Sequence, residues 1–188
     1  MTGNHILIKE NVLTGNEMSA LLDGGLTFCK TGIVTPGDLS PKLTLGRRSW
    51  EARLSSESHA LLFKKINYLY DEACSVFNVT YNKESTTLSV MRYRAQDLGN
   101  FDWHRDTIYS PSLATVRKLS LVLLLDDKYD GGALCFESAR YENIKAGTCF
   151  IFPSDLLHCV EPVVSGVRHS LVSWAYGAAE RLEELHEN

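Results

Sequence analysis

The feature that most constrains the fold is a series of short β-rich runs that fills the second half of the chain. The runs are TTLSVMRY, RKLSLVLLL, ALCFES, TCFIFP, LLHCVEPV and RHSLVSWAY. Turn-forming stretches separate them, among them DDKYDGG, PSD and VVSG. Strands of this length at this spacing are typical of an antiparallel sandwich or barrel. The second half of the chain therefore predicts a β-structure with two packed sheets.

The pattern before these runs is helical. The segment TGNEMSALLDGG predicts a short helix, with Thr14 or Asn16 as its N-cap and a pair of glycines at its end. A longer helix is expected from Ser55 or Ser56 to about Phe77, because apolar residues recur there at spacings of three and four. The apolar face of this longer helix is expected to pack against a sheet.

The order of these elements predicts one α+β domain, mainly β, over residues 1–188. We expect residues 1–85 to supply helical support, 86–177 to form the β-core and 178–188 to be a charged helical tail. Within the first region, Lys30–Trp50 is rich in glycine and proline and has little periodicity. It predicts a long loop of the kind that often serves as a lid or binding segment.

Composition limits the partners of this domain. The net charge is −4, which argues against a nucleic-acid binder that relies on bulk positive charge. The longest strongly apolar run, Leu119–Leu125, is too short to span a bilayer, and the N-terminal residues do not resemble a secretory signal. The chain has five cysteines and no CxxC pair, as in reduced proteins of the cytoplasm. We therefore expect a cytoplasmic protein that binds neither nucleic acid nor membrane; its oligomeric state is not indicated.

The sequence WHRD contains a His-x-Asp pair, His104 and Asp106, and His158 lies on a later predicted strand. Residues at i and i+2 project from the same side of a strand, so the pair can converge on one point. Asp102 has the same parity as His104 and is an alternative to Asp106. Two imidazoles and one carboxylate form a set that binds Fe(II) on one face and leaves the opposite positions open.

Arg168 lies ten residues beyond His158, across the turn-like VVSG segment. Consecutive strands of a jelly roll commonly belong to opposite sheets, about 10 Å apart. An inward Arg168 would therefore face the metal across the interior, at a separation that suits a short dicarboxylate. His169 and Cys159 have the opposite parity to Arg168 and His158, so neither is expected to join the cluster.

These residues resemble the catalytic core of the iron(II)- and 2-oxoglutarate-dependent dioxygenases. The similar segments lie between about Leu88 and Tyr176 and read LSVMRYRAQDLGNFDWHRD, RKLSLVLLLDDKYDGGALCF and AGTCFIFPSDLLHCVEPVVSGVRHSLVSWAYG. Within that superfamily, the chain is most similar to the prolyl 4-hydroxylase group, including the bacterial PKHD-type hydroxylases. The resemblance covers nearly half of the chain by motif, and the order of helices and strands extends it more loosely to the rest.

The resemblance implies a double-stranded β-helix, or jelly roll, with the N-terminal helices packed on its major sheet. It implies His104, Asp106 and His158 as the ligands of Fe(II), and hence as the catalytic centre. Arg168 matches the basic residue that pairs with the distal carboxylate of 2-oxoglutarate.

Further cosubstrate contacts are implied by the same resemblance. Tyr93 matches a tyrosine that hydrogen-bonds 2-oxoglutarate from a neighbouring strand, and Ser170 falls where Arg-x-Ser places a hydroxyl near the carboxylate. Trp174 matches an aromatic residue near the pocket of prolyl hydroxylases, although packing in the core accounts for it equally well. Some relatives carry a second tyrosine where this chain has the aliphatic run Leu121–Leu125, so no cosubstrate contact is expected from that strand.

The activity implied is hydroxylation of an unactivated C–H bond by O2, with succinate and carbon dioxide as coproducts. The expected substrate is a prolyl residue in a peptide or protein, and ascorbate is an additional reductant that relatives often use. A free amino acid or other small molecule is the first alternative substrate. A non-catalytic, metal-binding jelly-roll module is the alternative outside enzymes. Asp106 favours hydroxylation over halogenation, and Trp174 stands where related nucleic-acid demethylases carry a second arginine.

Overall fold

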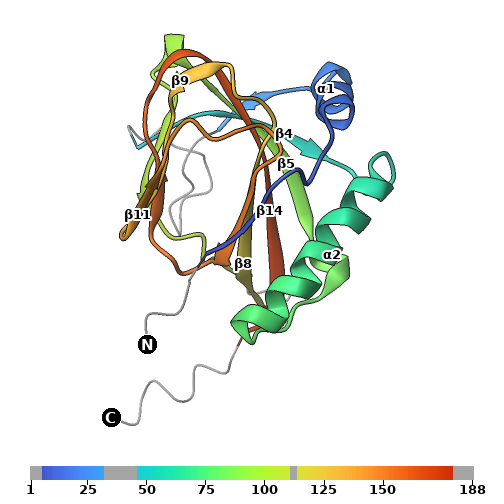
Figure 1. Ribbon diagram of the computed structural model, residues 1–188. Helices are drawn as coiled ribbons and strands as arrows, with labels where there is room; N and C mark the ends of the chain where they lie inside the picture. Colours follow the sequence, from blue (N-terminus) through green and yellow to red (C-terminus); the bar gives the residue numbers. More distant parts are fainter. Residues whose placement is uncertain (1–5, 32–45, 111–113, 180–188) are drawn as a thin grey trace.

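The computed structural model describes residues 6–31, 46–110 and 114–179, and in these residues the strands form two antiparallel sheets (Figure 1). The larger sheet has the order β1-β12-β8-β14-β5-β4-β2, with β7 paired to β8 and β9 paired to β14. Its strands are β1 (Leu7–Lys9), β2 (Cys29–Lys30), β4 (Trp50–Leu54), β5 (Thr87–Arg94), β7 (Tyr109–Ser110), β8 (Thr115–Leu124), β9 (Tyr129–Gly131), β12 (Cys149–Pro153) and β14 (Val163–Ala178).

The smaller sheet has the order β11-β10-β13-β6-β3. Its strands are β3 (Arg47–Arg48), β6 (Asn100–His104), β10 (Leu134–Phe136), β11 (Ala139–Tyr141) and β13 (His158–Val160). Two short 3-10 helices, η1 (Lys83–Ser85) and η2 (Ala95–Asp97), flank β5. The two sheets face each other, and the crossovers between them are those of a double-stranded β-helix, as the sequence predicts.

Two hydrophobic clusters cover the two faces of the larger sheet. Alternation along β8 separates them: Leu121 and Leu123 belong to the cluster shared with the helices, whereas Val122 and Leu124 belong to the cluster between the sheets. Successive side chains of a strand point to opposite faces, which explains the split. Parity along β8 therefore tells which residues face the interior of the jelly roll.

The helix α1 (Gly15–Asp23) begins at the N-cap Thr14, one of the two predicted caps, and ends at Gly24. The Thr14 hydroxyl accepts from the backbone N–H of Glu17 at 3.3 Å, and the Glu17 carboxylate accepts from the backbone N–H of Thr14 at 2.7 Å. This reciprocal capping box satisfies two N–H groups at the start of the helix.

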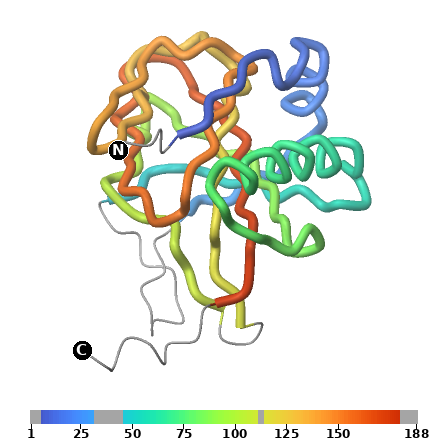
Figure 2. Tube along the Cα trace, turned by 60° about the horizontal axis from the view of Figure 1, so that its bottom comes forward, coloured from blue at the N-terminus to red at the C-terminus, as the bar shows by residue number. Residues whose placement is uncertain are grey.

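The helix α2 (Ala60–Phe77) begins later than the predicted Ser55 or Ser56. The Ser55 hydroxyl accepts from the backbone N–H of Ser58, which caps a turn that precedes the helix. The predicted end is confirmed, because Asn78 follows Phe77 in the left-handed conformation with φ 53°. Buried residues of α2 join the cluster on the larger sheet, and Figures 1 and 2 show both helices on the same side of the β-structure.

The predicted turn VVSG is wrong. Val163–Gly166 opens β14 and pairs with β9, with Val163 opposite Gly131 and Gly166 opposite Tyr129. The register shifts between Val163 and Ser165, and Gly166 has φ +74°. Glycine and serine mark a β-bulge here, because a bulge and a turn draw on the same residue types.

Two sequence expectations fall partly outside the described residues. Of the expected loop Lys30–Trp50, the structure describes the ends, which lie in β2, β3 and β4, while residues 32–45 lie outside. Residues 180–188, which make up most of the expected C-terminal tail, also lie outside the described residues.

None of the described helices is long and apolar enough to cross a membrane. The five cysteines are free thiols, and Cys135, Cys149 and Cys159 are buried.

Candidate metal centre and cosubstrate pocket

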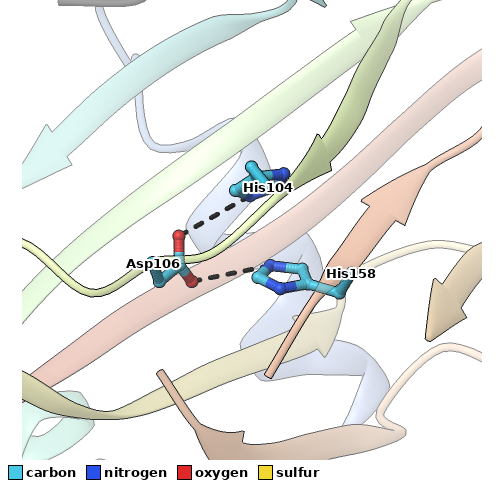
Figure 3. A group of neighbouring side chains, drawn as sticks. All are labelled: His104, Asp106 and His158. Carbon is cyan, nitrogen blue, oxygen red and sulfur yellow. Dashed lines mark ion pairs between the residues drawn. The ribbon is translucent and has the colours of Figure 1, made fainter. Parts of the chain in front are cut away.

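Three side chains that the sequence singles out meet between the sheets (Figure 3). His104 ends β6 and His158 begins β13, and these antiparallel strands pair so that the two histidines are opposite each other. Asp106 lies two residues beyond the end of β6. Ligand atoms of the three residues all lie within 4.8 Å of one another. The structure thus assembles two imidazoles and one carboxylate at one point of the interior.

Backbone hydrogen bonds orient both imidazoles. Nδ1 of His104 lies 2.7 Å from the carbonyl oxygen of Asp102, and Nδ1 of His158 lies 2.9 Å from that of Leu156. A carbonyl oxygen only accepts, so Nδ1 carries a proton in each ring, and Nε2 is the nitrogen that is left to bind a metal. The two Nε2 atoms face the Asp106 carboxylate, each 3.6 Å from one of its oxygens. Both histidines are therefore held in the tautomer that binds a metal through Nε2.

Burial sets the charge of the cluster. It lowers the pKa of His104 to about 4, and the neighbouring charge of His158 acts in the same direction. Burial alone would raise the pKa of the Asp106 carboxyl, but His158, His104 and hydrogen bonds from Trp174 and Ser120 hold it below its usual range. At neutral pH, His104 is neutral and Asp106 is ionised, which is the protonation state of metal ligands.

The structure decides between the two aspartates. The Asp102 side chain is exposed and accepts from the Asn100 amide at 2.8 Å, whereas Asp106 is 8% exposed and belongs to the cluster. His169, expected to point away, pairs with Asp126 through Nδ1 at 2.5 Å. The expected convergence is found, but its reason is different, because Asp106 is not on the strand that carries His104.

Arg168 faces the cluster from the other sheet. It lies on β14 of the larger sheet, is fully buried, and lines the same cavity as His104, Asp106 and His158. Its Nη1 donates to the Ser170 hydroxyl at 3.2 Å, while Nε and Nη2 have no hydrogen-bond partner among the residues that the structure describes. Among the described residues no carboxylate forms an ion pair with it. A buried guanidinium with free donors is costly unless an anion completes it.

The other two predicted cosubstrate residues surround this guanidinium. Tyr93 lies opposite Arg168 on β5, and the centre of its ring is 5.4 Å from the guanidinium carbon. Burial raises the pKa of the Tyr93 phenol, so its hydroxyl stays a proton donor. Tyr93 and Ser170 line the cavity, which encloses about 440 Å³ including its open part, and Trp174 lines it as well.

Several residues of this site were not predicted from the sequence. Arg47 and Phe101 line the cavity, and the Phe101 ring stacks on His104 with centroids 3.5 Å apart. Ser120 and Ser154 contact Asp106 from outside the cavity. Ser120 could have been identified from the sequence, because it is a polar residue inside the apolar run of β8.

Residues 88–176 match the model of the 2OG-Fe(II) oxygenase superfamily. This match implies Fe(II) and 2-oxoglutarate, and the residues present fit both. His104, Asp106 and His158 are the donor set that suits Fe(II), and the free nitrogens of Arg168 suit a carboxylate. The chain is thus an oxidoreductase of the dioxygenase type.

Several similar proteins are named as hydroxylases. A PKHD-type hydroxylase of Synechococcus sp. (strain CC9902) is 29% identical over 180 residues, which cover 85% of this chain and 80% of the relative. The viral collagen prolyl hydroxylase of Paramecium Bursaria Chlorella virus-1 superposes with a TM-score of 0.69 at 20% identity, covering 94% of this chain and 98% of that one. A Pseudomonas putida prolyl-4-hydroxylase superposes with a TM-score of 0.68 at 16% identity, covering 93% and 94%. At these identities the two solved structures establish the fold.

Proposed function

We propose that the protein hydroxylates a prolyl residue in a peptide or protein, using Fe(II), 2-oxoglutarate and O2. The observation that carries the proposal is the arrangement of His104, Asp106 and His158 opposite a fully buried, incompletely paired Arg168 in one cavity. Fe(II) with 2-oxoglutarate supplies the oxidation of an unactivated C–H bond by O2, with succinate and carbon dioxide as coproducts. We assign His104, Asp106 and His158 as the metal ligands.

The remaining residues bind and orient. Arg168 holds the distal carboxylate of 2-oxoglutarate with the two nitrogens that lack partners, and Ser170 orients the guanidinium through Nη1. Tyr93, with its phenol protonated, donates a hydrogen bond to the cosubstrate. The apolar side chains that line the cavity, such as Val122 and Val172, exclude water from around these charges and so strengthen each interaction.

The class of substrate is inferred from similar proteins. The solved structures that superpose on this chain include prolyl hydroxylases, one of them in complex with a peptide fragment of hypoxia inducible factor from Trichoplax adhaerens. These neighbours support a peptide as the substrate of this chain. Substrate choice in a shared fold depends on the loops around the site, so the substrate needs its own test.

The test measures succinate formation with candidate substrates. Wild-type protein, Fe(II) and 2-oxoglutarate are incubated in air with proline-containing peptides, with the same peptides carrying alanine for proline, and with free amino acids. We expect a proline-containing peptide to raise succinate formation above the uncoupled rate and to gain one oxygen atom by mass spectrometry. The alanine peptides should do neither, and His158→Ala should form no succinate.

Two outcomes would overturn the proposal. A free amino acid or other small molecule that stimulates succinate formation where no peptide does would make the protein a small-molecule hydroxylase. No succinate from any mixture, together with a large fall in melting temperature for His158→Ala, would make the metal structural and the protein a non-catalytic jelly-roll module.

A further inference from the structure

The position of Asp106 is not explained by the strand that precedes it. β6 ends at His104, so the pairing of β6 with β13 holds the two histidines but not the aspartate. Asp106 nevertheless is 8% exposed, and its carboxylate faces both Nε2 atoms (Figure 3). A carboxylate that is held in one orientation outside regular secondary structure needs other contacts to hold it.

Besides the hydrogen bond from Trp174, two serines supply these contacts: Ser120 on β8, and Ser154, the residue after β12. The Ser120 hydroxyl, on β8, donates to Oδ2 of Asp106 at 2.8 Å. The Ser154 hydroxyl lies 2.9 Å from that of Ser120, and the Ser154 carbonyl accepts from the Asp106 backbone N–H at 2.8 Å. Ser120 and Ser154 are each 1% exposed. Because the Ser120 proton is used on Asp106, Ser154 must donate to Ser120, and the two hydroxyls form a directed chain that ends on the carboxylate.

Ser120 is a polar residue among apolar neighbours on the inner face of β8. Ser120 has the same parity as Val122 and Leu124, which pack between the sheets, so its hydroxyl stands in an otherwise apolar row facing the interior. A buried hydroxyl in such a row is destabilising unless it is hydrogen-bonded. Its two partners here are the aspartate and the serine that also contacts the aspartate backbone.

We propose that Ser120 is a positioning residue of the metal centre, with Ser154 as its support. Ser120 acts through Asp106: it fixes the rotation of the carboxylate so that both oxygens face the imidazoles, and it links a ligand beyond the smaller sheet to the larger sheet. The inference rests on the metal site of the proposed function and is independent of the prolyl substrate.

The test measures metal affinity in place of turnover. Apoprotein is titrated anaerobically with Co(II), and its visible absorption gives the dissociation constant for wild type, Ser120→Ala, Ser120→Thr and Ser154→Ala. We expect Ser120→Ala to weaken Co(II) binding by about 10- to 100-fold, the usual loss when a hydrogen bond to a metal ligand is removed. Ser120→Thr keeps the hydroxyl and should restore most of the affinity. Ser154→Ala keeps its backbone contact and should show a smaller loss.

Ser173→Ala is the matched control. Ser173 is also a fully buried serine of the larger sheet, but it lies beside Tyr70, on the face that packs against α2. It should bind Co(II) as wild type does. Equal affinity of Ser120→Ala and wild type, or equal losses in Ser120→Ala and Ser173→Ala, would overturn the inference. Failure of wild type to bind Co(II) would instead contradict the metal site itself. If Ser120→Ala does not fold, the Co(II) affinity of Ser154→Ala is compared with that of Ser173→Ala instead. Equal affinities of these two variants would then overturn the inference.

Discussion

Arg168 shows at the scale of one residue that this site is built for a ligand at the expense of stability. Its side chain is fully buried, and within the described part of the chain two of its nitrogens have no hydrogen-bond partner and no carboxylate pairs with it. Such a charge is destabilising without its anion, and replacing buried charge by an apolar side chain of similar volume is often neutral or stabilising. The free protein should therefore tolerate the loss of this arginine better than the loaded protein.

We predict that Arg168→Met leaves the free energy of unfolding of the apoprotein unchanged or raises it by about 1 kcal/mol or more. The same change should abolish the thermal stabilisation by 2-oxoglutarate, because the free nitrogens that would bind its distal carboxylate are gone. Urea unfolding of the apoprotein and melting curves with and without 2-oxoglutarate measure the two effects.

Arg92→Met is the control for this prediction. Arg92 lies on the same pair of strands, but its guanidinium carbon stacks 4.0 Å from the centre of the Phe28 ring. Its loss should lower stability by about 0.5–1 kcal/mol and leave 2-oxoglutarate binding intact. A strongly destabilised Arg168→Met apoprotein would show that the arginine has a structural role, contrary to the assignment.

At the scale of elements, the capping box makes α1 a helix whose stability can be tested separately from the site. Thr14→Ala removes the hydroxyl that accepts from the Glu17 N–H. N-cap substitutions of this kind cost about 1 kcal/mol. We predict a loss of that size in urea unfolding of Thr14→Ala, with unchanged metal affinity. Thr14→Ser keeps the cap and should be close to wild type, whereas equal losses in both variants would contradict the role of the hydroxyl.

The same capping box predicts a dependence of stability on pH. Hydrogen bonds from Lys65 and from Thr14 lower the pKa of Glu17 from 4.5 to about 2. A carboxylate whose pKa is lower in the folded state stabilises it above the unfolded pKa, and the effect disappears as the pH falls through the folded value. We predict that Glu17→Gln is less stable than wild type at pH 7 and that the difference vanishes towards pH 2. A constant difference across this range would show that ionisation of Glu17 does not matter.

These elements also show what the sequence could predict. Features that depend on residues close together in the sequence could be predicted. Examples are the N-cap at Thr14, the end of α2 near Phe77 and the β-rich runs. The VVSG segment was misjudged because only the partner strand β9 distinguishes a bulge from a turn. The beginning of α2 was misplaced because Ser55 caps a turn before the helix.

For the candidate site, the three residues of the metal cluster and Arg168 were predictable from the sequence, but the residues that support them were not. The jelly-roll pattern placed Arg168 in the interior, the resemblance pointed to Tyr93, and both line the cavity. Parity along the strand correctly left His169 out, because alternation is a local property. Parity could not explain Asp106, which leaves its strand and is held by Ser120 from the other sheet. Contacts of this kind join segments far apart in the chain, and a single sequence carries no record of such pairings.

At the scale of the whole molecule, the proposed ligands join the two sheets. His104 and His158 belong to the smaller sheet, whereas Arg168 lies on the larger one and Asp106 is tied to it through Ser120. Anything held by both groups must be released before either sheet separates from the other. Its binding free energy is then added to the stability of the jelly roll as one cooperative unit.

We predict that a redox-inert divalent metal such as Mn(II), together with 2-oxoglutarate, raises the free energy of unfolding by about 2.7 kcal/mol at 100 times the dissociation constant. For a domain of this size, that corresponds to a rise of roughly 5–10 °C in melting temperature. Amide hydrogen exchange should slow in the central strands of both sheets, including β13 and β14, and His158→Ala should show neither effect. Slower exchange confined to β6 and β13 would mean that the metal stabilises the smaller sheet locally, and the two sheets would not be linked through the site.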